Sequence, residues 1–300
     1  MAKAVYVGVD SKARKMKKAY VGIGGKARKV KKMYIGVGGK ARLCYSAEAD
    51  KFGTATPLSK YRIFLAGTTV GGYALFGGGG YDSDAKKGEA IMDAYNASLT
   101  RTTATPLPSN AYACAGGTVG GYAVFSGGSS INSDSTLVEI IGNIEIVRAY
   151  DSSLTSSKAA PLSCPRAVHS AATIGNHLLF AGGYNSTTGK YLSTVESYDA
   201  SLTRSTAVEL SSAKNGLASA TVGEYAMFAG GYKGNSDAAY VATVDAYNTA
   251  LTKTTMPDLS VGRYGLASAV IGDYALFAGG ISKIQGPAYK YQDVVDVYSA

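Results

Sequence analysis

Short apolar segments that end in a pair of glycines recur five times along this chain of 300 residues. Apolar residues occupy consecutive positions in each segment, which is typical of a β-strand covered on both faces. A stretch of small residues (Ala, Ser, Gly and Thr) precedes each one. The pattern therefore predicts five buried strands, each after a strand of small side chains. The copies are GYALFGGGG at 72–80, GYAVFSGG at 121–128, NHLLFAGGY at 176–184, EYAMFAGGY at 224–232 and DYALFAGGI at 273–281.

A second phrase, typified by VESYDASLT, alternates with the first and holds the tyrosines Tyr95, Tyr150, Tyr198 and Tyr247, with weaker copies at Tyr45 and Tyr298. The distance from each tyrosine to the next repeat's phenylalanine is 30 residues in four cases and 31 in the first. The distance from phenylalanine to the following tyrosine varies from 18 to 25 residues. Length variation is thus confined to one loop per repeat, as expected of a rigid repeated unit with variable loops on one face.

Each repeat reads as four strands, which we call a to d. The small residues form strand a, the apolar segment strand b, the tyrosine phrase strand c, and a TRSTAVEL-like stretch strand d. Small side chains suit strand a if several sheets converge near an axis, and the double glycine lets the chain leave strand b with backbone angles that other residues resist. The expected fold class is an all-β propeller.

These features resemble the kelch repeat: an apolar strand ending in Gly-Gly, a Tyr-Asp about twenty residues later, and an Arg before the next strand a. The glycine pairs are 78–79, 127–128, 182–183, 230–231 and 279–280, and the Arg position holds Arg62, Ala111, Arg166, Lys214 and Arg263. The resemblance implies a five-bladed kelch-like β-propeller over residues 44–300. The chain finishes on a strand c, so we expect the strand near 51–59 to complete the last blade and remove its open edge.

Residues 1–43 repeat with a period of 14, marked by Tyr6, Tyr20 and Tyr34. Each unit predicts a β-hairpin, with a YVGV strand, a turn at Asp-Ser or Gly-Gly, and a basic KARK strand. This arm carries a net charge of +12, whereas residues 44–300 carry −3. The YVGVGGKARKVKK units resemble N-terminal segments of tail-fibre-like proteins of phages and prophages. The resemblance implies an arm that attaches to virion or tail proteins, a host-facing C-terminal module, and homo-trimers of the fibre kind.

Composition narrows the remaining classes. The three cysteines, Cys44, Cys114 and Cys164, have neither ligand spacing nor an even count, which argues against a disulfide framework. We expect no secretory signal, because the first residues lack a continuous apolar stretch, and no membrane span. The expected location is the virion tail, after synthesis in the bacterial cytoplasm. Direct binding of nucleic acid by the arm is disfavoured, because the regular β-like register is unlike that of a disordered basic tail.

Candidates for catalysis are few. His169 and Cys114 align with leucines of other repeats, and His177 aligns with tyrosines, so all three are interpreted as structural. Two histidines without clustered cysteines predict no metal site, and no cofactor motif is present. Acidic residues at strand c, such as Asp199, Asp245 and Asp296, recur at one level, which favours hydrogen bonding at a turn or strand end. We therefore predict a protein that is not an enzyme, with hydrolysis of glycans as the less favoured reading.

The loops after each Gly-Gly are the better candidates for binding. These b–c loops share a face with the d–a turns of a propeller, and they are rich in Tyr, Ser, Asn and Asp, which suit contact with a host-surface glycan or protein. The alternative is that loops are polar and variable in any protein. The candidate binding residues are Tyr81, Asp82, Asp84, Asn132, Asp134, Tyr184, Asn185, Tyr191, Tyr232, Asn235, Tyr240, Tyr289 and Tyr291.

The sequence thus favours a phage or prophage tail-associated, receptor-binding protein, with the arm as anchor and the loops as the contact surface. A bacterial kelch-type adhesin or protein-interaction scaffold is the alternative. Neither the receptor nor the oligomeric state follows from the sequence.

Overall fold

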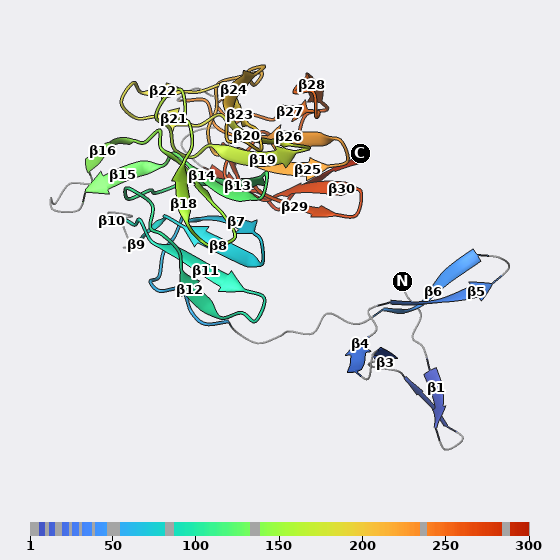
Figure 1. Cartoon of the computed structure of the whole chain (residues 1–300). Helices are drawn as coiled ribbons and strands as arrows, with labels where there is room; N and C mark the ends of the chain where they lie inside the picture. The colour runs from blue at the N-terminus through green and yellow to red at the C-terminus, as the bar shows by residue number, and fades with distance from the viewer. Residues whose placement is uncertain are drawn as a thin grey trace. The chain divides into compact units, whose positions relative to one another are not determined.

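The computed structural model describes residues 6–9, 12–15, 20–23, 26–29, 32–37, 40–46, 55–81, 87–132, 139–234, 239–283 and 289–299. The chain divides into two compact units, Met1–Thr54 and Ala55–Ala300. Figure 1 shows that every regular element in the described part is a β-strand, which confirms the all-β class. No helix among these residues is long and apolar enough to cross a membrane.

The smaller unit contains the three hairpins that its period of 14 predicts. β1 (Tyr6–Val9) pairs with β2 (Lys12–Lys15), β3 (Tyr20–Ile23) with β4 (Lys26–Lys29), and β5 (Lys32–Val37) with β6 (Lys40–Ser46). Equivalent residues pair in the first two hairpins, since Tyr6 lies opposite Lys15 and Tyr20 lies opposite Lys29. The apolar and the basic strand of each unit are therefore the two halves of one hairpin.

The larger unit repeats one antiparallel sheet, in which strands a, b, c and d lie side by side in that order. We number these sheets first to fifth along the chain. The a strands are β7 (Ala66–Val70), β13 (Ala115–Val119), β19 (Ser170–Ile174), β25 (Ala218–Val222) and β29 (Ala267–Ile271). The b strands are β8 (Tyr73–Gly77), β14 (Tyr122–Ser126), β20 (His177–Ala181), β26 (Tyr225–Ala229) and β30 (Tyr274–Ala278).

The c strands are β11 (Met92–Asn96), β17 (Val147–Tyr150), β23 (Val195–Tyr198), β27 (Val244–Tyr247) and β33 (Val295–Ser299). The d strands are β12 (Arg101–Thr103), β18 (Ser156–Lys158), β24 (Arg204–Ala207) and β28 (Lys253–Met256). Within the described residues, four sheets thus have four strands and the fifth has three. The division into four strands is confirmed for the first four repeats, while the number of blades stays a prediction.

Four of the b–c loops carry a short hairpin of their own. These are β9 (Gly80–Tyr81) with β10 (Lys87–Gly88), β15 (Ser129–Asn132) with β16 (Glu139–Asn143), β21 (Tyr184–Asn185) with β22 (Lys190–Tyr191), and β31 (Ile281–Lys283) with β32 (Tyr289–Tyr291). The described parts of these loops therefore include paired backbone that can position side chains.

The phenylalanine and tyrosine that mark each repeat are ring partners in the core. Phe180 of β20 and Tyr198 of β23 meet edge to face with ring centroids 5.7 Å apart, and both are fully buried. The Tyr198 hydroxyl also donates a hydrogen bond to the Ala160 carbonyl, which follows strand d of the second sheet. The pair therefore fills the core between two sheets and joins them.

Each glycine pair lies where the next sheet approaches the backbone. Gly182 has φ 69°, and a Cβ built on it would lie 2.6 Å from the Lys214 carbonyl oxygen of the next repeat. The Gly183 amide, at φ 110°, donates to that same carbonyl at 2.9 Å. Only a residue without a side chain permits both the backbone angles and this approach.

A ladder of backbone hydrogen bonds also runs from sheet to sheet, one residue per repeat, just before strand a. Ala113 N donates to Phe64 O, Val168 N to Ala113 O, Gly216 N to Val168 O and Gly265 N to Gly216 O, at 2.9–3.1 Å. Successive sheets are therefore held in register by the backbone as well as by apolar packing.

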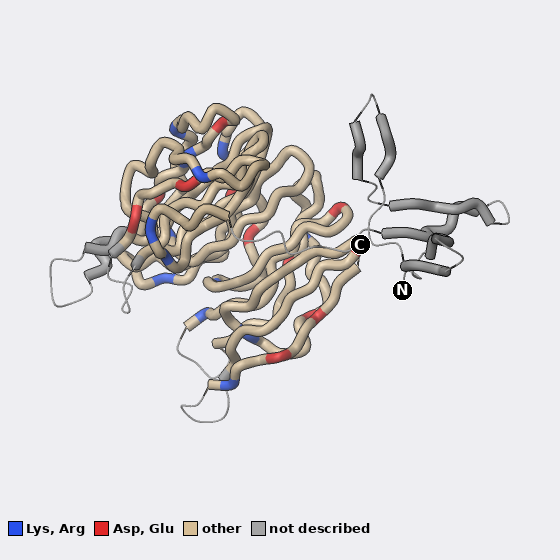
Figure 2. The backbone as a smooth tube through the Cα atoms, turned by 90° about the horizontal axis from the view of Figure 1, so that it is seen from below, with Lys and Arg blue, Asp and Glu red and all other residues tan. Residues whose placement is uncertain are grey.

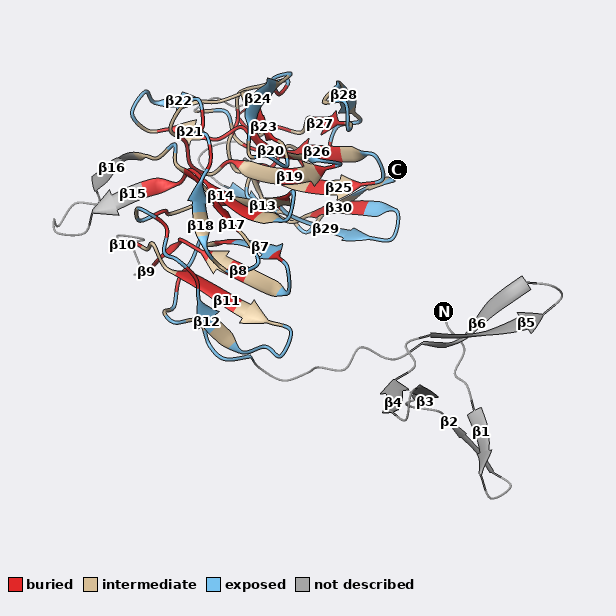
Figure 3. Ribbon diagram, in the orientation of Figure 1, coloured by how far each residue is buried: buried red, intermediate tan, exposed pale blue. Residues whose placement is uncertain are grey.

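Within the described residues, the first and the fifth sheet each leave one face uncovered. Figure 3 shows exposed residues along β29 and at one end of β30 in the fifth sheet. The corresponding strands of the inner sheets are largely buried. Among the described residues, β33 pairs only with β30. Residues 55–58 form no strand, the Ser59 hydroxyl donates to Asp93 of the first sheet at 3.0 Å, and 51–54 lie outside the described residues. Completion of the last blade by the 51–59 segment thus stays a prediction.

Candidate functional site

The d–a turns and the b–c loops meet at one end of the larger unit. Asn215, in the turn before β25, exchanges backbone hydrogen bonds with Tyr232 at 2.9 and 3.0 Å, and Tyr264 does the same with Ile281 at 2.9 Å. Tyr232 also forms a bridge with Tyr240 across its own loop. These contacts place the residue after each basic position beside the loop that follows the same repeat's Gly-Gly.

A cavity of about 350 Å³ opens among these segments, and we call it the tyrosine pocket. Its rings form a continuous cluster: Tyr184 and Tyr191 have centroids 5.0 Å apart, Tyr191 and Tyr232 5.7 Å, and Tyr232 and Tyr240 5.3 Å. Tyr264 joins the cluster 6.1 Å from Tyr232. The lining residues are Tyr184, Tyr191, Asn215, Tyr232, Tyr240, Tyr264, Ile281 and Tyr289.

The described residues that line the pocket are Tyr, Asn and Ile, so this part of its wall has polar groups but no formal charge. Burial raises the pKa of Tyr191, and the neighbouring hydroxyls of Tyr232, Tyr184 and Tyr264 raise it further. Burial also raises the pKa of Tyr264. Both phenols therefore stay protonated at neutral pH and can donate as well as accept hydrogen bonds.

Five of the candidate binding residues come together in this pocket: Tyr184, Tyr191, Tyr232, Tyr240 and Tyr289. Two described candidates do not line it, because Asn185 is buried and accepts a hydrogen bond from Thr188 N, while Tyr291 is 84% exposed. Tyr81 and Asn132 lie on β9 and β15, and their side chains are outside the described part of the structure. Asp82, Asp84, Asp134 and Asn235 lie outside the described residues.

Three lining residues, Asn215, Tyr264 and Ile281, were not among the candidates from the sequence. Asn215 and Tyr264 directly follow the basic position of their repeats, where the equivalent residues are Ile63, Tyr112 and Ala167. The change of residue type at this one position, next to an otherwise regular motif, is the signal that could have identified them.

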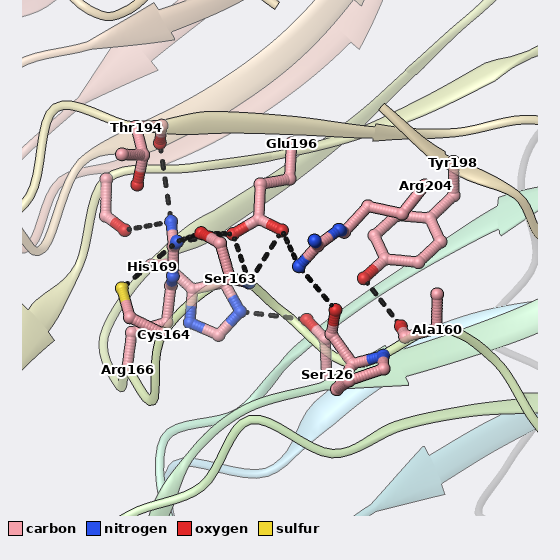
Figure 4. A network of polar contacts seen from close by, with 12 residues as sticks. Ser126, Ala160, Ser163, Cys164, Arg166, His169, Thr194, Glu196, Tyr198 and Arg204 are labelled. Carbon is pink, nitrogen blue, oxygen red and sulfur yellow. Dashed lines mark hydrogen bonds and ion pairs between the residues drawn. The ribbon is translucent and has the colours of Figure 1, made fainter. Parts of the chain in front are cut away.

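The basic position itself is structural. Arg166 is fully buried and forms an ion pair with the buried Glu196 of β23 at 2.5 Å, and Ser163 donates to the same carboxylate from its amide and its hydroxyl. Figure 4 shows this network, in which Arg204 approaches the second oxygen of Glu196 at 3.4 Å. The hydrogen bonds from Ser163 and Arg166 to Glu196 join the d–a turn to strand c and so hold the repeat together.

The same pairing recurs in three other repeats, as Arg62 with Asp93 at 2.7 Å, Lys214 with Asp245 at 3.4 Å and Arg263 with Asp296 at 2.8 Å. The acids at strand c thus have the hydrogen-bonding role that their recurrence predicts. Asp199 has another role of the predicted kind, because its carboxylate accepts hydrogen bonds from Ser201 N and Thr203 N in the c–d turn.

The histidines and cysteines have the structural surroundings that repeat alignment predicts. His169 is buried, contacts Ser126 Oγ at 2.8 Å through Nε2, and packs edge to face on Phe180. Burial, with Arg166 nearby, lowers the pKa of His169 to about 3. Burial raises the pKa of the Cys114 thiol to about 11. Neither group is therefore poised as a base or a nucleophile at neutral pH.

His177 contacts Ser197 Oγ at 3.0 Å, and the Arg166 guanidinium lies 3.5 Å from the sulfur of the half-buried Cys164. Within the described ranges, no group of three or more His, Cys, Asp and Glu side chains could hold a metal ion. The chemistry available at the tyrosine pocket is therefore ring stacking and hydrogen bonding.

Comparison with known proteins supports the fold. A family model described as "Kelch motif" matches residues 165–201, which span the d–a turn, β19, β20 and β23. A solved structure titled "Structure of YjhT" is similar over 92% of this chain and 95% of its own, with 14% sequence identity and a TM-score of 0.59. No curated protein sequence matches. The chain therefore folds as a kelch-like β-propeller, and at this level of identity the structural similarity concerns the fold alone.

Proposed function

We propose that this chain is an interaction module without catalytic activity, which binds its partner through the tyrosine pocket. Kelch-type propellers are typical scaffolds for protein interactions, and the kelch motif at 165–201 supports that class here. The observation that carries the proposal is the convergence of six tyrosines, from four separate segments, on one cavity. Tyrosine offers a large rigid contact area with a polar tip at small entropic cost, which suits a binding surface.

The surroundings of the pocket favour binding over catalysis. General acid–base chemistry needs a titratable group whose pKa lies near the working pH. Among the described residues that line the pocket, none carries a carboxylate, imidazole, amine or thiol. Both histidines lie elsewhere, since His177 is in the b strand β20 and His169 directly precedes the a strand β19. Partner recognition is the role that such a wall supports best.

A cell-binding assay with the full-length chain tests this proposal. The fluorescently labelled protein is incubated with bacterial cells of candidate host strains, and bound protein is measured by flow cytometry. Tyr232→Ala and Tyr264→Ala should each reduce binding about tenfold, because contact residues at the centre of an interface dominate its affinity. Tyr291→Ala, which removes an exposed ring outside the pocket lining, is the matched control and should bind like the parent. Unchanged binding by the pocket variants would overturn the proposal.

The arm supports a more specific setting for this activity, as part of a phage or prophage tail. Its three basic hairpins, repeated every 14 residues, are a regular structure with a high positive charge, suited to an acidic surface on a virion partner. We propose that the arm anchors the chain to the tail and that the propeller faces the host. The alternative is an adhesin or scaffold of a bacterial cell.

Virion attachment can be tested separately from host binding. Replacing Lys26, Arg28 and Lys29 of β4 with Gln should reduce the amount of protein that sediments with purified tail particles, while binding of the free protein to cells is unchanged. Tyr232→Ala should have the opposite pattern. Absence of the protein from purified particles would exclude the tail setting but leave the interaction module intact.

A further inference from the structure

The tyrosine pocket restricts the chemistry of its ligand beyond what the proposed function requires. Its described lining residues are uncharged, and along the backbone tube of Figure 2 the charged residues of the larger unit form short separate stretches. A charged ligand would lose hydration on entering such a cavity without gaining an ion pair. The walls therefore favour an uncharged ligand.

The ligand must also combine an apolar face with several hydrogen-bonding groups. The ring cluster from Tyr184 to Tyr264 provides flat apolar surface, and its hydroxyls provide donors and acceptors around it. Purely aliphatic ligands would leave these hydroxyls unsatisfied, at a penalty for every group that loses water. A ligand with alternating C–H and hydroxyl groups matches the walls on both counts.

Asn215 favours a ligand that donates a hydrogen bond. Its side-chain oxygen Oδ1 is shielded from solvent, and no hydrogen bond reaches it in the structure. An unpartnered buried atom of this kind costs free energy, because it forgoes a hydrogen bond that it would make in water. The terminal amide torsion of Asn is soft, so a small rotation can turn Oδ1 toward a ligand in the cavity. A ligand that donates a hydrogen bond would satisfy this atom.

The preference for a hydrogen-bond donor distinguishes between two kinds of uncharged ligand that bind aromatic pockets, proline-rich peptides and sugars. Proline-rich segments dock on aromatic grooves, but proline has no N–H to donate. A sugar ring presents C–H groups for stacking and hydroxyls that donate and accept. We infer that the tyrosine pocket binds an uncharged saccharide, an inference that rests on the proposed function of this same site.

A glycan array of neutral and acidic saccharides, probed with the full-length chain, is the first test. The expected result is binding to neutral glycans, and calorimetric titration of the best one then gives its affinity. Tyr232→Ala should weaken this affinity about 3- to 10-fold through loss of stacking. Asn215→Ala should weaken it by a similar factor through loss of one hydrogen bond.

Two variants guard against misfolding as the cause. Tyr289→Ala truncates a lining residue that is 62% exposed, so it should weaken saccharide binding while leaving the circular dichroism spectrum and the melting temperature unchanged. Tyr291→Ala, in the same hairpin but outside the lining, should retain the parent affinity.

The outcomes separate this inference from the proposed function. If no neutral glycan binds, or if acidic glycans or a proline decapeptide bind instead, the saccharide inference is wrong. The proposed function then still stands, provided that Tyr232→Ala lowers binding to cells. If a neutral glycan binds equally to the parent, Tyr232→Ala and Tyr289→Ala, the pocket is not its site. If neither glycans nor cells distinguish the pocket variants from the parent, both proposals fail.

Discussion

The fourth and fifth sheets are built from nearly the same sequence and differ in what covers them. Val222, the last residue of β25, is 3% exposed, whereas its equivalent Ile271 in β29 is 70% exposed. In strand c, Val244 is fully buried and its equivalent Val295 is 50% exposed. The apolar pattern thus specifies the strand, whereas burial depends on the neighbouring sheet.

The first sheet is also uncovered on one face, namely the face that packs on the preceding sheet in the other repeats. Phe76 and Tyr95 are half-buried, whereas the equivalent rings Phe125 and Tyr150 of the second sheet are buried. A cavity of about 670 Å³, with mainly apolar walls, lies against Phe76 and Tyr95. The backbone ladder between sheets correspondingly begins at Phe64 and ends at Gly265. Substitutions at equivalent positions can therefore measure what an adjacent sheet contributes to stability.

The largest effect is expected at the buried ion pair. Glu196→Ala leaves the fully buried Arg166 without its carboxylate, and removal of one partner from such a pair typically costs about 3–5 kcal/mol. The free energy of unfolding from urea titration measures the loss. Glu209→Ala, at an exposed position on the following turn, is the control and should change stability by less than about 0.5 kcal/mol. A loss below about 1 kcal/mol for Glu196→Ala would contradict the role assigned to this network.

Truncation of equivalent phenylalanines compares an inner sheet with the first sheet. Phe180→Ala should destabilise the protein by about 3–5 kcal/mol, because the ring is fully buried. Phe76→Ala should have a clearly smaller effect, since its ring is half-exposed. Equal losses in urea titration would show that the outer face of the first sheet is covered in solution.

Truncation of equivalent valines makes the same comparison at the other end. Val244→Ala should cost about 2 kcal/mol, from lost apolar burial and the residual cavity. Val295→Ala removes a half-exposed side chain and should cost less than about 0.5 kcal/mol. If both variants lose the same stability, the fifth sheet has a neighbour in solution that covers β33.

The free energy of unfolding is expected to depend on pH through His169 of the third repeat. The equivalent position holds leucine, which does not titrate, in three other repeats. The pKa of His169 is about 3 in the folded protein, against an ordinary value of 6.5. The unfolded chain therefore binds a proton that the folded protein does not, between about pH 6.5 and pH 3. The stability from this group is complete above pH 6.5 and declines as the pH falls, by up to about 1.4 kcal/mol per pH unit.

His169→Leu should remove this part of the pH dependence. Urea titrations of the parent and the variant at several pH values between 4 and 8 measure it. If the free energy of unfolding changes with pH in the same way in the parent and in His169→Leu, the assignment of a buried neutral imidazole is contradicted.

Much of the fold could be predicted from the sequence, because its causes are local and repeated. Gly182 and Gly183 recur because the next sheet's backbone leaves no room for a side chain, and the Phe180–Tyr198 spacing recurs because the two rings meet. The hairpins of the arm follow from alternation and turn residues in the same way. The kelch resemblance rested on these features, and the kelch motif and the structural similarity confirm it.

The site was predictable only in part. Tyrosine-rich loops indicated the face on which the pocket lies, but the pocket depends on which loop meets which turn. The bridge between Asn215 and Tyr232 comes from packing between segments 17 residues apart, and in the sequence only the change of residue type after the basic position points to it. Tyr291, two residues from Tyr289, looks the same in sequence, yet it is 84% exposed and does not line the pocket.

The central claim is that the tyrosine pocket is where a partner binds, and hydrogen–deuterium exchange of the full-length chain tests it most directly. The protein is compared alone and with bound host cell-wall fragments. The account predicts slower amide exchange in the loop segments 184–191 and 231–241 and around Tyr264, with no change at the c–d turns that contain Asp151, Asp199 and Asn248. Protection confined to those turns, or to the exposed strands β29 and β33, would contradict it.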